Sequence, residues 1–362
     1  MKYRNLLGKK TKTKIIVFES DDWGSFRFKN KYIRDKFIKN FNPHLWMHNY
    51  DTFESANDLQ NLFDTLKAIK GKDDKNPKFT FLMNPSNPDF KKIKESNFQN
   101  FYNETFLETL DNRNDGKEIF DLYNTALENK MIEIGFHGRE HLNVNQWMND
   151  LKNNDKIAHL GFENKVWGFS GLFVPNAMKS YRSTFDINSY HEIKKLKNNI
   201  AEGISIINKT FNQKTTYFLP PDGPYHLSLN SELVHNGIDY IGLSKLHNNP
   251  LEPQWYHKKL FWIGKTTKEG LTVITRNVIF EPSSPRHNDP INFALKQITD
   301  AFKHNKPAVI SSHRANFVGS LNSQQRDISL KLLSDLICKI IKIWPEVEFM
   351  TSSELGVLLK NS

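Results

Sequence analysis

The sequence IIVFESDDWG, residues 15–24, decides how this chain folds. Its first half is apolar and rich in β-branched residues, a pattern that is typical of a buried strand. Its second half brings two neighbouring carboxylates, Asp21 and Asp22, to the end of that strand. In α/β folds, functional sites are built at the carboxyl ends of strands. The stretch therefore predicts a central strand and one wall of a site.

A second stretch, IEIGFHGREH at residues 132–141, repeats this arrangement with histidines. His137 and His141 are spaced i and i+4, so both imidazoles can lie on one side of a turn that follows the strand. One carboxylate and two imidazoles form an open metal site with room for water and substrate. A neighbouring second carboxylate can then act as a base. A surface histidine pair, and an N-cap or turn role for the two aspartates, are the simpler interpretations.

Length and composition restrict the class of protein. The chain has 362 residues, 38% of them hydrophobic and 25% charged, which suits a globular protein with a sizeable core. No apolar stretch approaches the roughly 20 residues that a membrane span needs. Residues 1–14 are basic but lack the apolar segment of a secretory signal, so we expect a cytoplasmic protein. The single cysteine, Cys338, is expected in the core and excludes an internal disulfide.

The formal net charge of +10 raises the question of a nucleic-acid partner. Only ten of the 50 basic residues are arginines, the lysines are scattered, and no nucleic-acid-binding module is recognisable. We therefore expect no nucleic-acid partner. A solvated lysine surface explains the charge, while attraction to an anionic glycan, a nucleotide-linked sugar or a membrane surface stays open. The sequence does not predict an oligomeric state.

Strands and helices are expected to alternate along the chain. The strand-like runs lie near residues 14–19, 78–83, 131–136, 214–218, 238–242, 271–275, 307–311 and 346–350. Helical periodicity is present near residues 55–70, 117–129, 189–208, 291–304 and 323–343. Alternation of this kind predicts a parallel sheet or barrel, and we expect a single domain over residues 1–362.

The motifs resemble those of the polysaccharide deacetylase family, also called the NodB-homology or carbohydrate esterase family 4 fold. ESDDWG at 19–24 resembles its first motif and HGREH at 137–141 its second. YFLPPDG at 217–223 resembles its third motif, and VISSH at 309–313 resembles a late strand that ends in a histidine. The order of the motifs agrees with the family. SHRAN at 312–316 and WPEVEF at 344–349 resemble a bacterial subgroup linked to surface-glycan synthesis.

This resemblance implies an α/β fold, a distorted (β/α)7 barrel with insertions, and a hydrolase. Asp22, His137 and His141 would hold a divalent metal, with zinc the expected ion. Asp21 would be the general base and His313 the general acid. The substrate would be an acetylated carbohydrate, carrying an N- or O-acetyl group, of a surface polysaccharide or its precursor. A structural role for His313 at the barrel rim is the simpler alternative.

Three departures from the family pattern are visible. In the first motif Trp23 stands before Gly24, which changes the loop beside the expected metal. Leu219 stands where the third motif carries an arginine that orients the base, and Arg182, Arg139 or Arg314 could replace it.

The first and second motifs are also farther apart than the family usually has them. This spacing implies an insertion at roughly residues 26–125, and residues 84–90 within it are expected near the site.

Five residues are candidates for contact with the substrate. Trp23 could stack on a sugar ring, and Asp222 and Tyr225, which follow two prolines, could line the groove. Arg182 and Arg314 complete this set.

Two other functions stay open. One is a glycan-binding protein on the same fold that has lost activity, which the missing motif arginine would favour. The other is a barrel glycosidase that uses Asp21 and a second carboxylate without a metal. The histidine pair argues against the glycosidase, because that chemistry does not need it.

Overall fold

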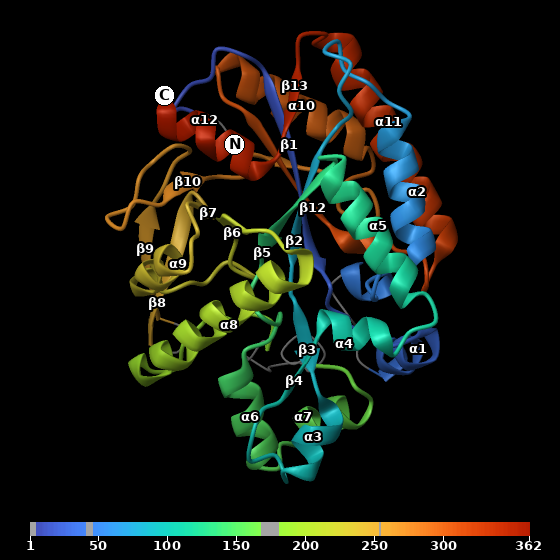
Figure 1. Ribbon diagram of the computed structural model, residues 1–362, viewed down its shortest axis with the longest axis vertical. Coiled ribbons are helices and arrows are strands. Elements are labelled where there is room, and N and C mark those ends of the chain that lie inside the picture. The colour runs from blue at the N-terminus through green and yellow to red at the C-terminus, as the bar shows by residue number, and fades with distance from the viewer. Residues whose placement is uncertain (1–4, 41–45, 168–180, 253–254) are drawn as a thin grey trace.

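The computed structural model describes residues 5–40, 46–167, 181–252 and 255–362. Within them the main sheet contains β1 (Ile15–Trp23), β2 (Phe79–Met83), β5 (Ile132–Phe136), β6 (Tyr217–Phe218), β7 (Tyr240–Gly242), β10 (Thr272–Ile274), β11 (Val278–Ile279), β12 (Ala308–His313) and β13 (Glu348–Met350). The strand order is β10–β7–β6–β5–β2–β1–β12–β11, with β13 beside β1, and the sheet curls into a half-barrel (Figure 1). The neighbouring strands of the sheet are parallel. The expected distorted α/β barrel is thereby confirmed.

Each strand-like run of the sequence contributes one strand to this sheet. β1 is the centre of it, because every one of its nine residues is buried and it pairs with β2, β12 and β13. A parallel strand covered on both faces needs such a continuous apolar run. The sequence did not predict β11, nor the separate antiparallel pairs β3 (Ser86–Pro88) with β4 (Asn103–Thr105) and β8 (Leu246–Glu252) with β9 (Trp255–Leu260). These strands are short or polar and lack a clear apolar alternation.

Helices cover the sheet on both flanks. Figure 1 shows α2 (Ala56–Lys67), α5 (Gly116–Glu128) and α11 (Ser323–Ile343) together on one flank, and α8 (Ile193–Phe211) with α9 (Asn230–His235) on the other. α10 (Pro290–Lys303) packs on α11 and β12, and α12 (Ser352–Asn361) packs on β1 and β10. The remaining helices are α1 (Lys31–Asn40), α3 (Phe90–Glu95), α4 (Phe106–Asp111), α6 (Val144–Lys152) and α7 (Lys156–Glu163), with the short 3-10 turns η1 (Trp46–Asn49), η3 (Tyr190–Glu192), η4 (Leu227–Leu229) and η5 (Arg314–Asn316).

The apolar stripe of α11 is part of the core. Leu333, Leu336 and Ile340 are fully buried on the side that faces the barrel, as the helical spacing predicts. Cys338 lies on the opposite side of the same helix and is exposed. Its expected place in the core was wrong, because a position two residues from Leu336 is rotated by about 200° around the helix axis.

Residues 26–125, where an insertion was expected, form one strand of the main sheet as well as helices and a separate strand pair outside it. β2 lies between β1 and β5, and α2 packs on α5, whereas β3, β4 and α3 extend from one end of the barrel (Figure 1). The description of the chain as one domain with an insertion there stays a prediction. Among the described residues, no helix combines the length and the apolar character that crossing a membrane requires.

We predict that Leu336→Ala lowers the free energy of unfolding by about 2–5 kcal/mol, because it removes buried methyl groups and leaves a cavity in the core. Urea denaturation followed by circular dichroism measures the change. Ile328→Ala on the same helix is the control, since Ile328 is 46% exposed and its truncation leaves no cavity. Equal losses for the two variants would show that α11 is not packed as described.

Candidate metal centre and active-site cavity

The carboxyl end of β1 departs from regular strand geometry. Consecutive side chains of a strand point to opposite faces, so Asp21 and Asp22 would normally diverge. The register between β1 and β2 shifts between Ser20 and Trp23, and Asp22 has a positive φ of 78°. Such a bulge turns one side chain toward its neighbour's side. Both carboxylates consequently line one cavity.

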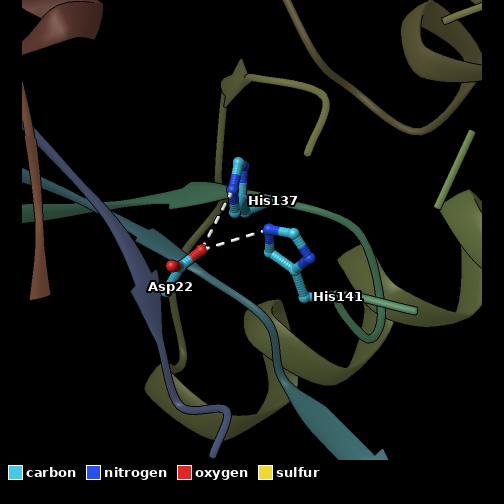
Figure 2. Close-up of side chains that lie close together, drawn as sticks. All are labelled: Asp22, His137 and His141. Atoms are coloured by element: carbon cyan, nitrogen blue, oxygen red, sulfur yellow. Dashed lines mark ion pairs between the residues drawn. The ribbon is translucent and has the colours of Figure 1, made fainter. Parts of the chain in front are cut away.

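Asp22 meets the two histidines that follow β5, as Figure 2 shows. Its Oδ1 lies 3.2 Å from Nε2 of His141 and 3.6 Å from Nε2 of His137. One ligand atom from each residue lies within 4.8 Å of the others, and all three side chains are buried. The predicted convergence of these three residues is confirmed.

The surroundings of each imidazole favour the neutral form, or the tautomer, that can bind a metal through Nε2. Nδ1 of His137 is 2.7 Å from the carbonyl oxygen of Leu219, to which it donates when Nε2 carries the lone pair. Burial lowers the pKa of His141 although the charge of Asp22 opposes that shift, and this favours the neutral ligand form. The turn is held by Asn84, whose Nδ2 donates to the carbonyl oxygens of His137 and Gly138, as expected for the 84–90 segment.

The donor set fits a divalent metal. Oδ1 of Asp22 is buried and accepts no hydrogen bond of good geometry from the described residues, while Oδ2 accepts one from Nη2 of Arg27 at 2.9 Å. A buried carboxylate oxygen that faces two imidazole nitrogens is unfavourable unless a cation or protons lie between them. Two nitrogens and one oxygen with an open side are a common catalytic zinc arrangement.

Arg27 belongs to a buried chain of alternating charges that the sequence did not reveal. It bonds Asp22 and Asp51, and Arg314 in turn bonds Asp51 at 2.7 Å and Glu54 at 2.9 Å. All of these side chains are at most 3% exposed. Burial raises the pKa of Asp22, but the charge of Arg27 and the contacts with the two histidines outweigh burial and hold that pKa well below its usual range. Asp22 is therefore a carboxylate at neutral pH.

Arg276 pairs with Asp21, a contact that Leu219 cannot make. It follows β10, donates from Nε to Glu19 at 2.6 Å and from Nη1 to Asp21 at 2.8 Å, and makes a second contact to Asp21 through Nη2. Burial raises the pKa of Asp21, yet the charge and hydrogen bonds of Arg276 prevail and the pKa lies below its ordinary value.

The expectation that Arg182, Arg139 or Arg314 would pair with Asp21 was wrong, because each of these arginines pairs with another carboxylate. Arg182 contacts Asp222, Arg139 contacts Glu140 and Glu202, and Arg314 contacts Asp51 and Glu54. Sequence spacing could not have identified Arg276, because it lies far along the chain and outside the motifs.

His313 stands at the end of β12, directly beside Asp21. β12 pairs with β1 so that His313 and Asp21 are in register, and Nε2 of His313 lies 3.7 Å from Oδ2 of Asp21. Nδ1 contacts Oε1 of Glu281 at 2.6 Å, and Asn316 holds the other oxygen of that carboxylate. Burial lowers the pKa of His313, but the charge and hydrogen bond of Glu281, with Asp21 behind them, raise it to about 10. The imidazole is thus protonated at neutral pH.

The cavity between these groups has a volume of about 490 Å³. Asp21, Asp22, His137, His141 and His313 form one wall, and the other walls include Asp222, Arg276 and the segment Ser244–Leu246. Among the predicted substrate contacts, Asp222 lines the cavity. Arg182 is not one of the lining residues, but its Nη2 lies 3.1 Å from Oδ2 of Asp222.

The other three predicted substrate contacts are corrected by the structure. Trp23 is 1% exposed and stacks on Phe81. Tyr225 is fully buried and donates to Asn230, and Arg314 lies in the buried charge chain. None of the three lines the cavity, because each is taken up by packing or pairing in the interior.

Comparisons with known proteins bear on the fold. No family model and no curated protein sequence matches the chain. A putative glycoside hydrolase/deacetylase from Parabacteroides distasonis superimposes with a TM-score of 0.50 at 8% identity, covering 96% of this chain and 71% of that one. This likeness shows the fold, and at that level it agrees with the resemblance of the motifs.

Two further structures match with lower TM-scores. A putative polysaccharide deacetylase from Mycobacterium smegmatis has a TM-score of 0.47 at 9% identity, covering 96% of this chain and 91% of that one. A 4-alpha-glucanotransferase from Thermococcus litoralis has a TM-score of 0.48 at 12% identity, covering 95% of this chain. This chain spans only 40% of the length of that glucanotransferase.

We predict that the protein binds one zinc ion per chain and that His137→Ala abolishes this binding, because it removes one of three ligands. Metal analysis after dialysis against zinc provides the measurement. His191→Ala is the control, since that histidine is exposed on η3. Unchanged zinc content in His137→Ala would place the metal elsewhere.

Proposed function

We propose that this protein is a metal-dependent deacetylase that removes an acetyl group from an N- or O-acetylated sugar of a surface polysaccharide or its precursor. One observation carries the proposal: Asp21, Asp22 and the His137–His141 pair share one cavity with His313, whose Nδ1 contacts Glu281. The fold is also that of a solved structure described as a putative glycoside hydrolase/deacetylase.

Asp22, His137 and His141 would hold the metal, and zinc is the ion that we expect there. When bound, the metal would polarise the acetyl carbonyl and acidify a water molecule. Asp21 is ionised, is held by Arg276 and lines the cavity together with Asp22, and these observations support its proposed role as the group that accepts the proton of the attacking water.

His313 would complete the reaction from its place beside Asp21. Its protonated Nε2 faces the cavity and donates a proton to the amine or alkoxide of the sugar as the acyl bond breaks. Glu281 keeps that proton in place through Nδ1. The two groups therefore have pKa values shifted in opposite directions, as an acid–base pair requires. The products are acetate and the deacetylated sugar.

The metal-independent glycosidase fits the geometry less well. Its general acid is a carboxyl group whose pKa is raised. Asp21 and Asp22 both line the cavity with lowered pKa values, and each is paired with an arginine, so neither is suited to remain protonated as that acid.

Asp21→Asn should reduce deacetylation by about 10²–10⁴-fold while zinc content stays normal, because the base is not one of the metal ligands. Asp22→Asn is the matched comparison and should lose both zinc and activity. Release of acetate from an acetylated oligosaccharide, together with metal analysis, distinguishes the two. Normal turnover by Asp21→Asn would remove Asp21 from the mechanism.

Glu281→Gln should move the alkaline limb of the kcat profile to lower pH. The charge of Glu281 raises the pKa of His313, so its removal lets burial lower that pKa, and the acid form is lost at a lower pH. Glu346→Gln, which changes an exposed carboxylate paired with Lys14, is the control. An alkaline limb unchanged by Glu281→Gln would mean that His313 is not the general acid.

A further inference from the structure

Two consecutive residues at the end of β12 have different surroundings. His313 lines the catalytic cavity, whereas the next residue, Arg314, is fully buried and does not line it. The proposed reaction gives Arg314 no task, although it belongs to the stretch SHRAN at 312–316. A fully buried arginine is rare unless it is paired, so its partners indicate what it holds in place.

The guanidinium of Arg314 uses all three of its nitrogens. Nε and Nη2 donate to Oδ1 of Asp51 at 3.2 and 2.7 Å, and Nη1 donates to Oε2 of Glu54 at 2.9 Å. Nη1 also donates to the backbone carbonyl oxygen of Ser25, three residues after Asp22. The planar fork of an arginine makes this set of contacts, and the single ammonium group of a lysine cannot.

The residues that Arg314 holds in turn hold the chain that leaves β1. Residues 24–28 follow β1 directly, and we call them the β1 loop. Oε1 of Glu54 accepts a hydrogen bond from the backbone N–H of Gly24 at 3.1 Å. Oγ1 of Thr52 donates to the carbonyl oxygen of Phe28 at 3.0 Å. The β1 loop is therefore fastened at both ends to the segment just before α2.

Asp51 connects the two arginines of the buried charge chain. Its Oδ1 accepts from Arg314, while its Oδ2 accepts from Nε of Arg27 at 2.5 Å. Nη2 of Arg27 then reaches Oδ2 of Asp22 at 2.9 Å. The position of Arg27, and through it that of the Asp22 carboxylate, consequently depends on Asp51 and Arg314.

Stability alone is a weak reason for such a chain of charges. Well-packed apolar side chains of similar size often stabilise an interior as well as buried ion pairs do. Outside the charge chain, the side chains of Asp51, Glu54 and Arg314 bond only Tyr123 and the β1 loop among the described residues. Their contacts are thus concentrated on the loop that follows the metal ligand.

We infer that Arg314 and Asp51 are positioning residues of the metal centre, which fix the β1 loop and Arg27 and thereby orient Asp22 toward the metal. The end of β12 then presents the proposed acid, His313, to the cavity and supports the metal ligand from the interior. This role rests on the metal site of the proposed deacetylase and not on the identity of its substrate.

Titration of the metal-free protein with Co²⁺ tests the role of Arg314. Co²⁺ binds to nitrogen and oxygen ligands like those of zinc, and its visible absorption reports both its affinity and the geometry of its ligands. Arg314→Lys should weaken Co²⁺ binding about 10–100-fold and change the absorption spectrum, because lysine keeps the charge but loses the fork. The titration is made at a temperature at which circular dichroism shows the variant to be folded.

Arg326→Lys is the matched control. Arg326 is also buried, at 8% exposed, and its Nη1 lies 2.8 Å from Oδ1 of Asp58. It makes no hydrogen bond to the β1 loop within the described part of the chain. Arg326→Lys should lower the stability against urea but leave the Co²⁺ affinity and spectrum unchanged.

Asp51→Asn tests the same role without changing the shape of the side chain, and it decides the matter if Arg314→Lys does not fold. Removal of this charge leaves Arg27 compensated by Asp22 alone. Arg27 then competes more strongly with the metal for that carboxylate, so the affinity for Co²⁺ should fall at least 10-fold.

Two results would overturn the inference. One is wild-type affinity and an unchanged Co²⁺ spectrum in either folded variant, Arg314→Lys or Asp51→Asn. The other is an equal loss of affinity in Arg326→Lys, because it would show that the loss of any buried ion pair loosens the site.

Failure of the inference and failure of the proposed function give different results. If the wild-type protein and the variants bind Co²⁺ alike and the wild-type protein releases acetate, the inference fails and the deacetylase stands. If Co²⁺ binding depends on Arg314 but the zinc-loaded protein releases no acetate from N-acetylated chito-oligosaccharides or O-acetylated xylan, the inference stands and the deacetylase fails. A wild-type protein that binds no Co²⁺ overturns both.

Discussion

Carboxylates buried at the end of β1 need opposing charge, and the rest of the site is arranged to supply it. Asp21 and Asp22 lie next to each other at most 5% exposed, where unpaired charges would be strongly destabilising. Arg27 compensates Asp22 and Arg276 compensates Asp21, each from a different part of the chain. Because Arg27 engages only Oδ2, Oδ1 remains directed toward the histidines.

Ion pairs with oppositely charged partners also shift the pKa values of two neighbouring groups in opposite directions. Asp21 and His313 lie in register on adjacent strands, yet Arg276 lowers the pKa of the first and Glu281 raises that of the second. One residue is thereby held as a carboxylate and the other as a protonated imidazole, which the proposed roles of base and acid require. Leu246, the first residue of β8, lines the same cavity, so the β8–β9 hairpin begins at its wall.

Local sequence was sufficient for all strands of the main sheet except β11, and for the residues of the candidate metal site. Apolar runs such as residues 15–18 form buried strands wherever they pair, and polar residues directly after them must reach the carboxyl edge of a parallel sheet. Asp22, His137 and His141 could be predicted to converge for this reason. The antiparallel hairpins could not be predicted, because their strands are polar or short and depend on contacts with the barrel.

Only the tertiary structure decided which charges pair and which large side chains are buried. Arg276 and Glu281 reach Asp21 and His313 across the sheet, and nothing in their own sequence surroundings distinguishes them from the arginines and glutamates that pair elsewhere. Trp23, Tyr225 and Arg314 were expected at the substrate because of their neighbours in the chain, but packing against Phe81, Asn230 and Asp51 places them in the interior. Sequence periodicity reports the face of an element on which a residue lies, whereas ion pairs form between residues that only the assembled barrel brings together.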